Sequence, residues 1–136
     1  MVRALAVDDD PATLKALELL LSKCGYEVTI ADTGERALAL VDERDFDIVI
    51  TDLRIGDASG LSILTRVKRR NPAVPVVVIT GYASIESAVE AIKLGAYDYL
   101  TKPLFSDKVK ITVKRALERA ALSREVDHLR RELSQQ

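Results

Sequence analysis

The sequence predicts an α/β fold in which a five-stranded parallel sheet is covered by helices on both faces. Short apolar runs alternate with amphipathic stretches five times between the N-terminus and about residue 105. Two of the runs, 48–51 and 76–80, are continuous and rich in β-branched residues, which is typical of strands buried on both faces. Regular alternation of strand and helix favours a parallel sheet with helices on its two faces.

The five strands are predicted at residues 5–7, 28–30, 48–51, 76–80 and 97–100. Apolar residues at helical spacing lie between them. They are Leu14, Leu17, Leu20 and Leu21; Ala37, Leu38 and Val41; Leu61, Leu64 and Val67; and Ile85, Val89 and Ile92. Asp10 and Pro11 are suited to the N-cap and first turn of the first helix. Gly25 and Gly95 stand where glycine commonly ends a helix.

Residues 106–133 are predicted to form one long helix with Ser106 as its N-cap, because no glycine or proline interrupts them. Its first half carries an apolar stripe that should pack on the sheet: Val109, Val113, Ala116, Leu117 and Ala120. Leu122, Val126, Leu129 and Leu133 then recur at spacings of 4, 3 and 4, as in a coiled coil. Two heptads leave two interpretations open, a dimerising or linker helix and a solvated extension. We therefore divide the chain into a core at 1–105 and a final segment at 106–136.

Charge and hydropathy exclude several classes of protein. The 136 residues carry a net charge of −1, which argues against nucleic-acid binding through bulk charge. Residues 1–105 have a balance of −4 and residues 106–136 a balance of +3. The N-terminus does not resemble a signal peptide, and no apolar run approaches the roughly 20 residues that span a bilayer. We expect a soluble cytoplasmic protein that contacts neither membrane nor nucleic acid.

Candidate functional residues end or closely follow four of the five predicted strands. Asp8 and Asp9 come after the first strand, Asp52 after the third, Thr80 ends the fourth and Lys102 follows the fifth. Ligands of such sheets bind at the carboxyl ends of the strands, so these residues are expected to converge on one edge.

This combination of groups indicates phosphoryl chemistry. Carboxylates brought together repel one another, and a divalent cation such as Mg²⁺ relieves that repulsion. With a lysine and a hydroxyl beside them, Asp52 could attack phosphorus while cations neutralise the phosphoryl oxygens. Each acidic residue alone is also explained by loop capping, the role we give to Asp10. Whether the Lys102–Pro103 bond is cis or trans is left open by the sequence.

Together these motifs resemble the receiver domain of two-component response regulators. The matching pieces are VDDD at 7–10, TDLR at 51–54, VITG at 78–81 and GAYDYLTKP at 95–103. The resemblance covers residues 2–105 and implies the flavodoxin-like strand order 2-1-3-4-5 with five helices, the last extended. The stretches 80–84 and 95–99 further resemble receivers of AAA+ (NtrC-like) transcriptional activators.

The resemblance implies a metal site and a phosphoacceptor. Asp52 would accept the phosphoryl group. Asp9 and Asp52 would bind Mg²⁺ directly and Asp8 partly through water, with the backbone carbonyl of Arg54 as a further ligand. Mn²⁺ would be able to substitute for Mg²⁺. No other cofactor is implied.

The resemblance also implies how the signal leaves the site. Lys102 would contact the phosphoryl group, Thr80 would swing toward it, and Tyr99 would act as an aromatic switch three residues before the lysine. A histidine kinase would be the phosphoryl donor. A homodimer through the final helices is expected, as is an output domain, transcriptional in kind, outside this chain. Beyond self-directed phosphotransfer and autodephosphorylation, no enzymatic activity is expected.

One stretch departs from the family pattern. Ile55-Gly56 stand where the family commonly has Met-Pro. Glycine lacks the fixed φ of proline, so a more mobile loop is expected here, with consequences for metal affinity and phosphoryl lifetime.

The alternative function is a haloacid-dehalogenase-like phosphatase, which also uses an aspartyl nucleophile, Mg²⁺, a threonine and a lysine. Its Asp-x-Asp-x-Thr signature nearly fits residues 8–12, but Ala12 occupies the threonine position. The chain is also short for such an enzyme.

Overall fold

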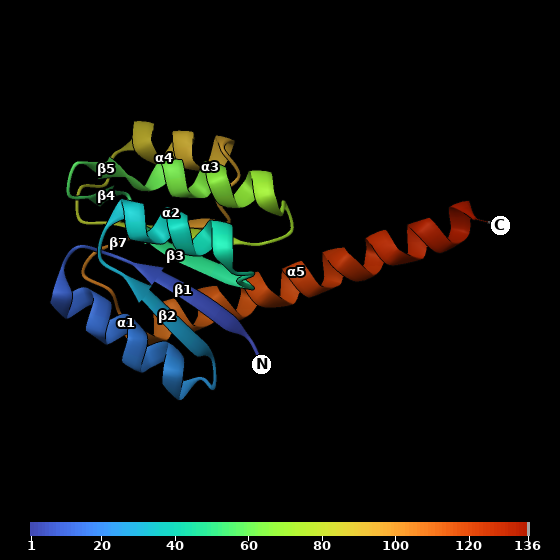
Figure 1. Ribbon diagram of the computed structural model, residues 1–136, viewed down its shortest axis with the longest axis horizontal. Helices are drawn as coiled ribbons and strands as arrows, with labels where there is room; N and C mark the ends of the chain where they lie inside the picture. The colour runs from blue at the N-terminus through green and yellow to red at the C-terminus, as the bar shows by residue number, and fades with distance from the viewer. Residues whose placement is uncertain (136) are drawn as a thin grey trace.

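A single parallel sheet lies between two layers of helices in the computed structural model, which describes residues 1–135 (Figure 1). Its strands lie in the order β2-β1-β3-β6-β7, and every neighbouring pair is parallel. They are β1 (Arg3–Val7), β2 (Glu27–Ala31), β3 (Ile48–Asp52), β6 (Val76–Thr80) and β7 (Asp98–Thr101). Counted along the chain, this is the order 2-1-3-4-5, so the predicted topology is confirmed.

Five helices cover the sheet; the first four lie between its strands in the chain, and the fifth follows β7. They are α1 (Pro11–Lys23), α2 (Gly34–Glu43), α3 (Gly60–Arg70), α4 (Ile85–Lys93) and α5 (Ser106–Ser134). Helices α1 and α5 lie on one face, and α2, α3 and α4 lie on the other (Figure 1). No helix within residues 1–135 has both the length and the apolar composition needed to cross a membrane.

The core is divided by the sheet into two apolar clusters, because successive strand residues point to opposite faces. From β1, Ala4 and Ala6 pack with α1 and α5, whereas Leu5 and Val7 pack with the helices of the other face. Strands β3 and β6 divide in the same way, which explains their uninterrupted apolar runs. Burial of each large aliphatic side chain in these clusters stabilises the folded state by about 1.5–3 kcal/mol relative to leaving it exposed.

The stretch that departs from the family pattern forms a small antiparallel pair, β4 (Arg54–Ile55) and β5 (Ala58–Ser59). The sequence predicted a mobile loop here and missed this pairing. Gly60 is required just beyond it, since a Cβ at this position would lie 2.0 Å from the backbone oxygen of Asp52. The residues after the third strand are thus folded closely against the strand's end.

The helix ends agree with their sequence signals in most places. The Asp10 side chain accepts a hydrogen bond from the N–H of Ala12 at the start of α1. Gly25 and Gly95 have positive φ angles of 89° and 105° at the ends of α1 and α4, as predicted. The cap predicted for α5 is wrong: Ser106 is its first helical residue, because the helical bonding already starts at the carbonyl of Phe105.

Helix α4 forms where predicted, but its apolar stripe is not buried. Ile85, Val89 and Ile92 are 81%, 45% and 51% exposed. The helix rests on the sheet through the small side chain of Ala91, which is fully buried, so the larger apolar groups point outward.

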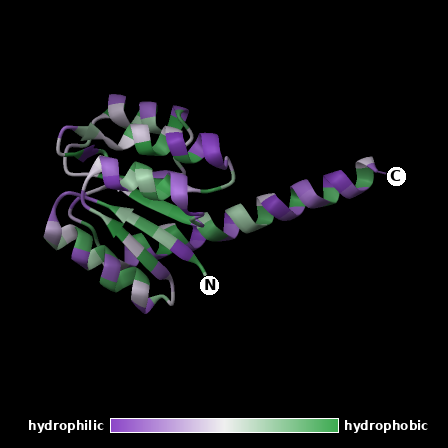
Figure 2. Cartoon of the chain, viewed as in Figure 1, coloured by the Kyte–Doolittle hydropathy of each residue, from purple (hydrophilic) through white to green (hydrophobic). Residues whose placement is uncertain are grey.

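Helix α5 packs on the sheet with its first half and continues beyond the body with its second (Figure 1). Val109, Val113, Ala116 and Ala120 are buried, as predicted. From residue 121 to residue 135 every residue is exposed. The projecting part alternates hydrophilic and hydrophobic residues (Figure 2), and its four large apolar side chains are Leu122, Val126, Leu129 and Leu133.

Candidate functional site

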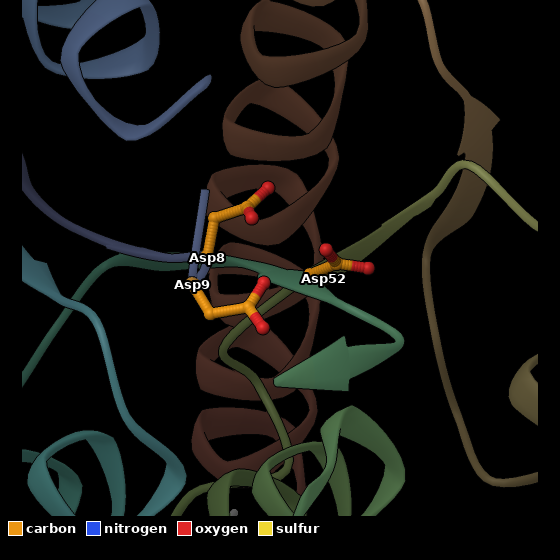
Figure 3. A group of neighbouring side chains, drawn as sticks. All are labelled: Asp8, Asp9 and Asp52. Carbon is orange, nitrogen blue, oxygen red and sulfur yellow. The ribbon is translucent and has the colours of Figure 1, made fainter. Parts of the chain in front are cut away.

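Three carboxylates meet at the carboxyl edge of the sheet. Strands β1 and β3 are neighbours with Val7 opposite Thr51, so the residues that follow in each strand come side by side. As a result, carboxylate oxygens of Asp8, Asp9 and Asp52 lie within 4.8 Å of one another (Figure 3). Asp8 and Asp52 are buried, and Asp9 is exposed. The predicted convergence of these residues is confirmed.

Lys102 brings a positive charge to two of these carboxylates. It follows β7, and its backbone N–H donates to the carbonyl of Thr80 over 2.8 Å. Its Nζ donates a hydrogen bond to Oδ2 of Asp52 over 3.0 Å and lies 2.8 Å from Oδ2 of Asp8. The Asp8 contact lacks the geometry of a hydrogen bond, so we describe it as an ion pair. The Lys102–Pro103 peptide bond is cis, the isomer that the sequence left open.

The electrostatics of the site favour binding of a further cation. Burial raises the pKa of Asp8, and the charge of Asp52 adds to this effect, although the contact with Lys102 and the hydrogen bond from the Asp10 N–H oppose it. Burial alone would lower the pKa of Lys102, but its contacts with Asp8 and Asp52 outweigh burial and raise this pKa. The buried pair Asp8 and Asp52 thus shares a single ammonium group.

A divalent cation fits the residues present. Oδ2 of Asp8 is buried and receives no hydrogen bond from any residue between 1 and 135. Its one ion pair in the described part of the chain is with the ammonium of Lys102, which Asp52 shares. Two buried carboxylates that share one ammonium are costly in free energy, and a coordinated cation is one remedy. Three carboxylates that present one oxygen each within 4.8 Å are a donor set suited to Mg²⁺.

A cavity of about 530 Å³ opens over these groups. It is lined by Asp9, Asp52, Arg54, Gly56, Gly81, Tyr82 and Lys102. The guanidinium of Arg54 lies 5.2 Å from the ring centroid of Tyr82, a cation–π distance. Both residues line the cavity, and Tyr82 was not among the residues singled out from sequence.

Thr80 and Tyr99 lie near the site and have other hydrogen-bond partners. Thr80 is buried at the end of β6, and its Oγ1 accepts a hydrogen bond from the N–H of Tyr82 over 3.0 Å. Tyr99 is half-buried in β7, with its hydroxyl 2.6 Å from Oγ of Ser87 in α4. Neither residue lines the cavity, so their switch roles stay predictions.

The loop after β3 supplies two backbone donors to the acidic cluster. The N–H of Arg54 donates to Oδ1 of Asp52 over 3.2 Å, and the N–H of Gly56 donates to Oδ2 of Asp9 over 2.8 Å. The second bond was missed in the sequence. The one feature of the sequence that points to this hydrogen bond is a glycine at a position where the family commonly has proline. Proline has no N–H to donate.

The comparisons with known proteins agree with this geometry. The family model described as "Response regulator receiver domain" matches residues 4–114. This chain belongs to that family. The receiver domain is 46% identical over 113 residues to the transcriptional regulatory protein ZraR of Escherichia coli O157:H7, covering 83% of this chain and 26% of ZraR. The predicted resemblance to receivers of AAA+ (NtrC-like) transcriptional activators is confirmed by relatives such as ZraR. The chain spans only about a quarter of the length of this relative.

Two solved structures resemble this receiver domain closely. A response regulator protein from Burkholderia pseudomallei, solved with a phosphorylated aspartic acid and a calcium ion, has a TM-score of 0.79 and 29% identity. That match covers 99% of this chain and 85% of the other. The beryllofluoride-activated receiver domain dimer of NtrC4 has a TM-score of 0.83 and 34% identity, covering 88% and 99%. The phosphatase alternative finds no support in these comparisons.

Proposed function

We propose that this receiver domain accepts a phosphoryl group on Asp52 from a phosphorylated histidine of a histidine kinase, in a Mg²⁺-dependent reaction. The observation that carries the proposal is the buried carboxylate of Asp52, 3.0 Å from the Lys102 ammonium and grouped with two further carboxylates under a cavity. Receiver domains act as phosphoacceptors, and the Burkholderia relative holds a phosphorylated aspartic acid.

The proposed transfer forms one bond and breaks one. An oxygen of Asp52 shares a lone pair with phosphorus while the P–N bond to the kinase imidazole breaks, and the imidazole nitrogen keeps that electron pair. The product is an acyl phosphate on Asp52. Lys102 already lies where new negative charge would develop, so it needs little movement to pair with a phosphoryl oxygen. Later attack by water would return the carboxylate and release inorganic phosphate, which is the expected autodephosphorylation.

Asp8, Asp9 and Asp52, with the backbone carbonyl of Arg54, would hold the cation. Bound Mg²⁺, or Mn²⁺ in its place, would supply positive charge to the phosphoryl oxygens. The protein's own contribution is to keep the carboxylates converged: Asp8 is fixed by the N–H of Asp10, and Asp52 by the N–H of Arg54 and by Lys102.

The signal would leave the site through Thr80 and Tyr99. A phosphoryl group adds about −1.5 to −2 charge, which attracts hydroxyl donors. For Thr80 to turn toward it, the hydrogen bond from Tyr82 N–H must be given up. Movement of Tyr99 would break its bond to Ser87, which lies in the first turn of α4. The start of α4 is therefore the element that we expect to respond.

We further infer a homodimer through the final helices and a transcriptional output in the larger protein. The exposed apolar positions of the projecting α5 support the first inference, and the naming of ZraR as a transcriptional regulatory protein supports the second. The dimer of the NtrC4 receiver is a precedent within the family.

The test is incubation with Mg²⁺ and a small-molecule phosphodonor, followed by intact mass measurement and peptide mapping. A single phosphoryl adduct is expected on the wild type and none on D52N. The matched control is D57N, which changes an exposed carboxylate in the neighbouring hairpin and should leave the adduct in place. An adduct that persists in D52N, or that maps to Asp8, would refute the assignment.

A further inference from the structure

The tip of the hairpin formed by β4 and β5 reaches the exposed member of the acidic cluster. There the N–H of Gly56 donates a hydrogen bond of 2.8 Å to Oδ2 of Asp9, a residue 47 positions earlier in the chain. Asp9 is the exposed member of the cluster, whereas Asp8 and Asp52 are buried. The side chain of Asp9 is not held in place by burial, so its orientation depends more strongly on this hydrogen bond than it would in a buried residue.

The donor itself is held firmly. The hairpin pairs Arg54 with Ser59 and Ile55 with Ala58, and the side chain of Ile55 is buried in the core. On its outer side, Ala58 lies so near the start of α2 that a Cβ on Gly34 would be 2.6 Å from the Ala58 Cβ. The tip between the two strands is therefore fixed on both sides.

Gly56 suits this task for two reasons. Its φ of +59° is a left-handed conformation that few residues other than glycine adopt readily. Its N–H is free to point at Asp9, whereas a proline at this position would have neither this φ nor a donor. The departure from the family's Met-Pro pattern thus adds a hydrogen bond to the cluster.

We propose that the N–H of Gly56 is a positioning donor for Asp9, holding one carboxylate oxygen so that the other is presented to the cation. This inference rests on the proposed metal site. Groups that orient metal ligands without touching the metal typically contribute 10- to 100-fold to metal affinity. A carboxylate already oriented also loses less side-chain freedom when the ion binds.

The first test compares Mg²⁺ affinity, measured by calorimetric titration, between G56P and G56N. G56P removes the donor and is expected to weaken Mg²⁺ binding by roughly tenfold or more. G56N retains the N–H, and asparagine tolerates positive φ, so its affinity should stay much closer to that of the wild type. Equal losses in the two variants would mean that hairpin shape alone matters, and would overturn the proposal.

The second test follows amide hydrogen exchange at Gly56 in the wild-type protein and does not require any hairpin variant to fold. The Gly56 amide is expected to exchange more slowly in the wild type than in D9A, both without metal and at saturating Mg²⁺. Exchange that is as fast as in D9A, or that accelerates when Mg²⁺ binds, would show that the bond does not hold Asp9 in the metal-bound site.

Failure of this inference can be told apart from failure of the proposed function. If the wild type binds no Mg²⁺ at all, the proposed metal site is wrong. If the wild type binds Mg²⁺ and G56P, shown to be folded by circular dichroism, binds it equally well, only the role of Gly56 is wrong.

Discussion

At the scale of single residues, the site holds one more buried negative charge than it can pair. Asp8 and Asp52 are both buried, and Lys102 is the one ammonium in contact with them among residues 1–135. Burial raises the pKa of Asp8, which means that protonation of this carboxyl is more favourable in the folded state than in the unfolded state. The arrangement serves cation binding at the expense of the stability of the metal-free fold.

The raised pKa sets the direction of the pH dependence. Between the ordinary value of 3.8 and the raised folded value, the folded state binds more protons at Asp8 than the unfolded state does. The contribution of this group to stability is therefore complete below 3.8 and is lost as pH rises through the folded pKa. Above it, the folded domain carries the full cost of the ionised carboxyl.

D8N is therefore expected to stabilise the metal-free domain at neutral pH. Asparagine keeps the shape of the side chain and an oxygen that can accept from the N–H of Asp10, while it removes one of the two buried carboxylate charges that share the Lys102 ammonium. We expect the free energy of unfolding in urea with a chelator present to rise by about 1 kcal/mol. The same variant should lose Mg²⁺ binding. If D8N is less stable than the wild type, the ion pair between Asp8 and Lys102 stabilises the fold by more than burial of the Asp8 carboxylate destabilises it.

At the scale of elements, the two halves of α5 have different roles. The first half completes the core, and the second half exposes an apolar stripe at coiled-coil spacing. With Leu122 and Leu129 at d positions and Val126 and Leu133 at a positions, Glu125 and Arg130 fall at g and e. In a parallel pair of helices these two residues face each other across the interface with opposite charge.

This pattern predicts a parallel dimer that depends on the stripe. L129E should weaken self-association at least tenfold, since each copy loses a buried leucine side chain. The matched control R131E adds the same carboxylate on the outer side of the helix and should leave association unchanged. Sedimentation velocity over a range of concentrations distinguishes the two. A wild type that stays monomeric, or an L129E variant that still dimerises, would favour a solvated extension.

At the scale of the whole molecule, a cation bound at the sheet edge should stabilise the entire domain. Ligands that bind only the folded state stabilise it by about 2.7 kcal/mol at 100 times their dissociation constant. We therefore expect the thermal midpoint to rise with Mg²⁺ concentration, measured against NaCl of matched ionic strength. D8N should show a much smaller rise. An equal shift with NaCl would mean that screening, and no specific site, is responsible.

The sequence by itself determined the succession of strands and helices and the identity of the strand-end groups. Strand and helix periodicities are local, so a single sequence reveals them, and parallel topology places strand ends at one edge. For this reason the convergence of Asp8, Asp9, Asp52 and Lys102 could be predicted from the sequence, although the distances between them could not.

Only the tertiary structure decided what depends on contacts between distant segments. The ion pair between Asp8 and Lys102 joins the end of β1 to the end of β7, and the bond between Asp9 and Gly56 joins residues 47 positions apart. Helix α4 likewise has the predicted period, yet Ala91 and not Ile85 faces the sheet. Local periodicity determines which residues share a face of a helix or strand. The packing of the whole chain determines whether that face is turned toward the sheet or toward solvent. It also determines which acceptor a backbone N–H in a loop can bond.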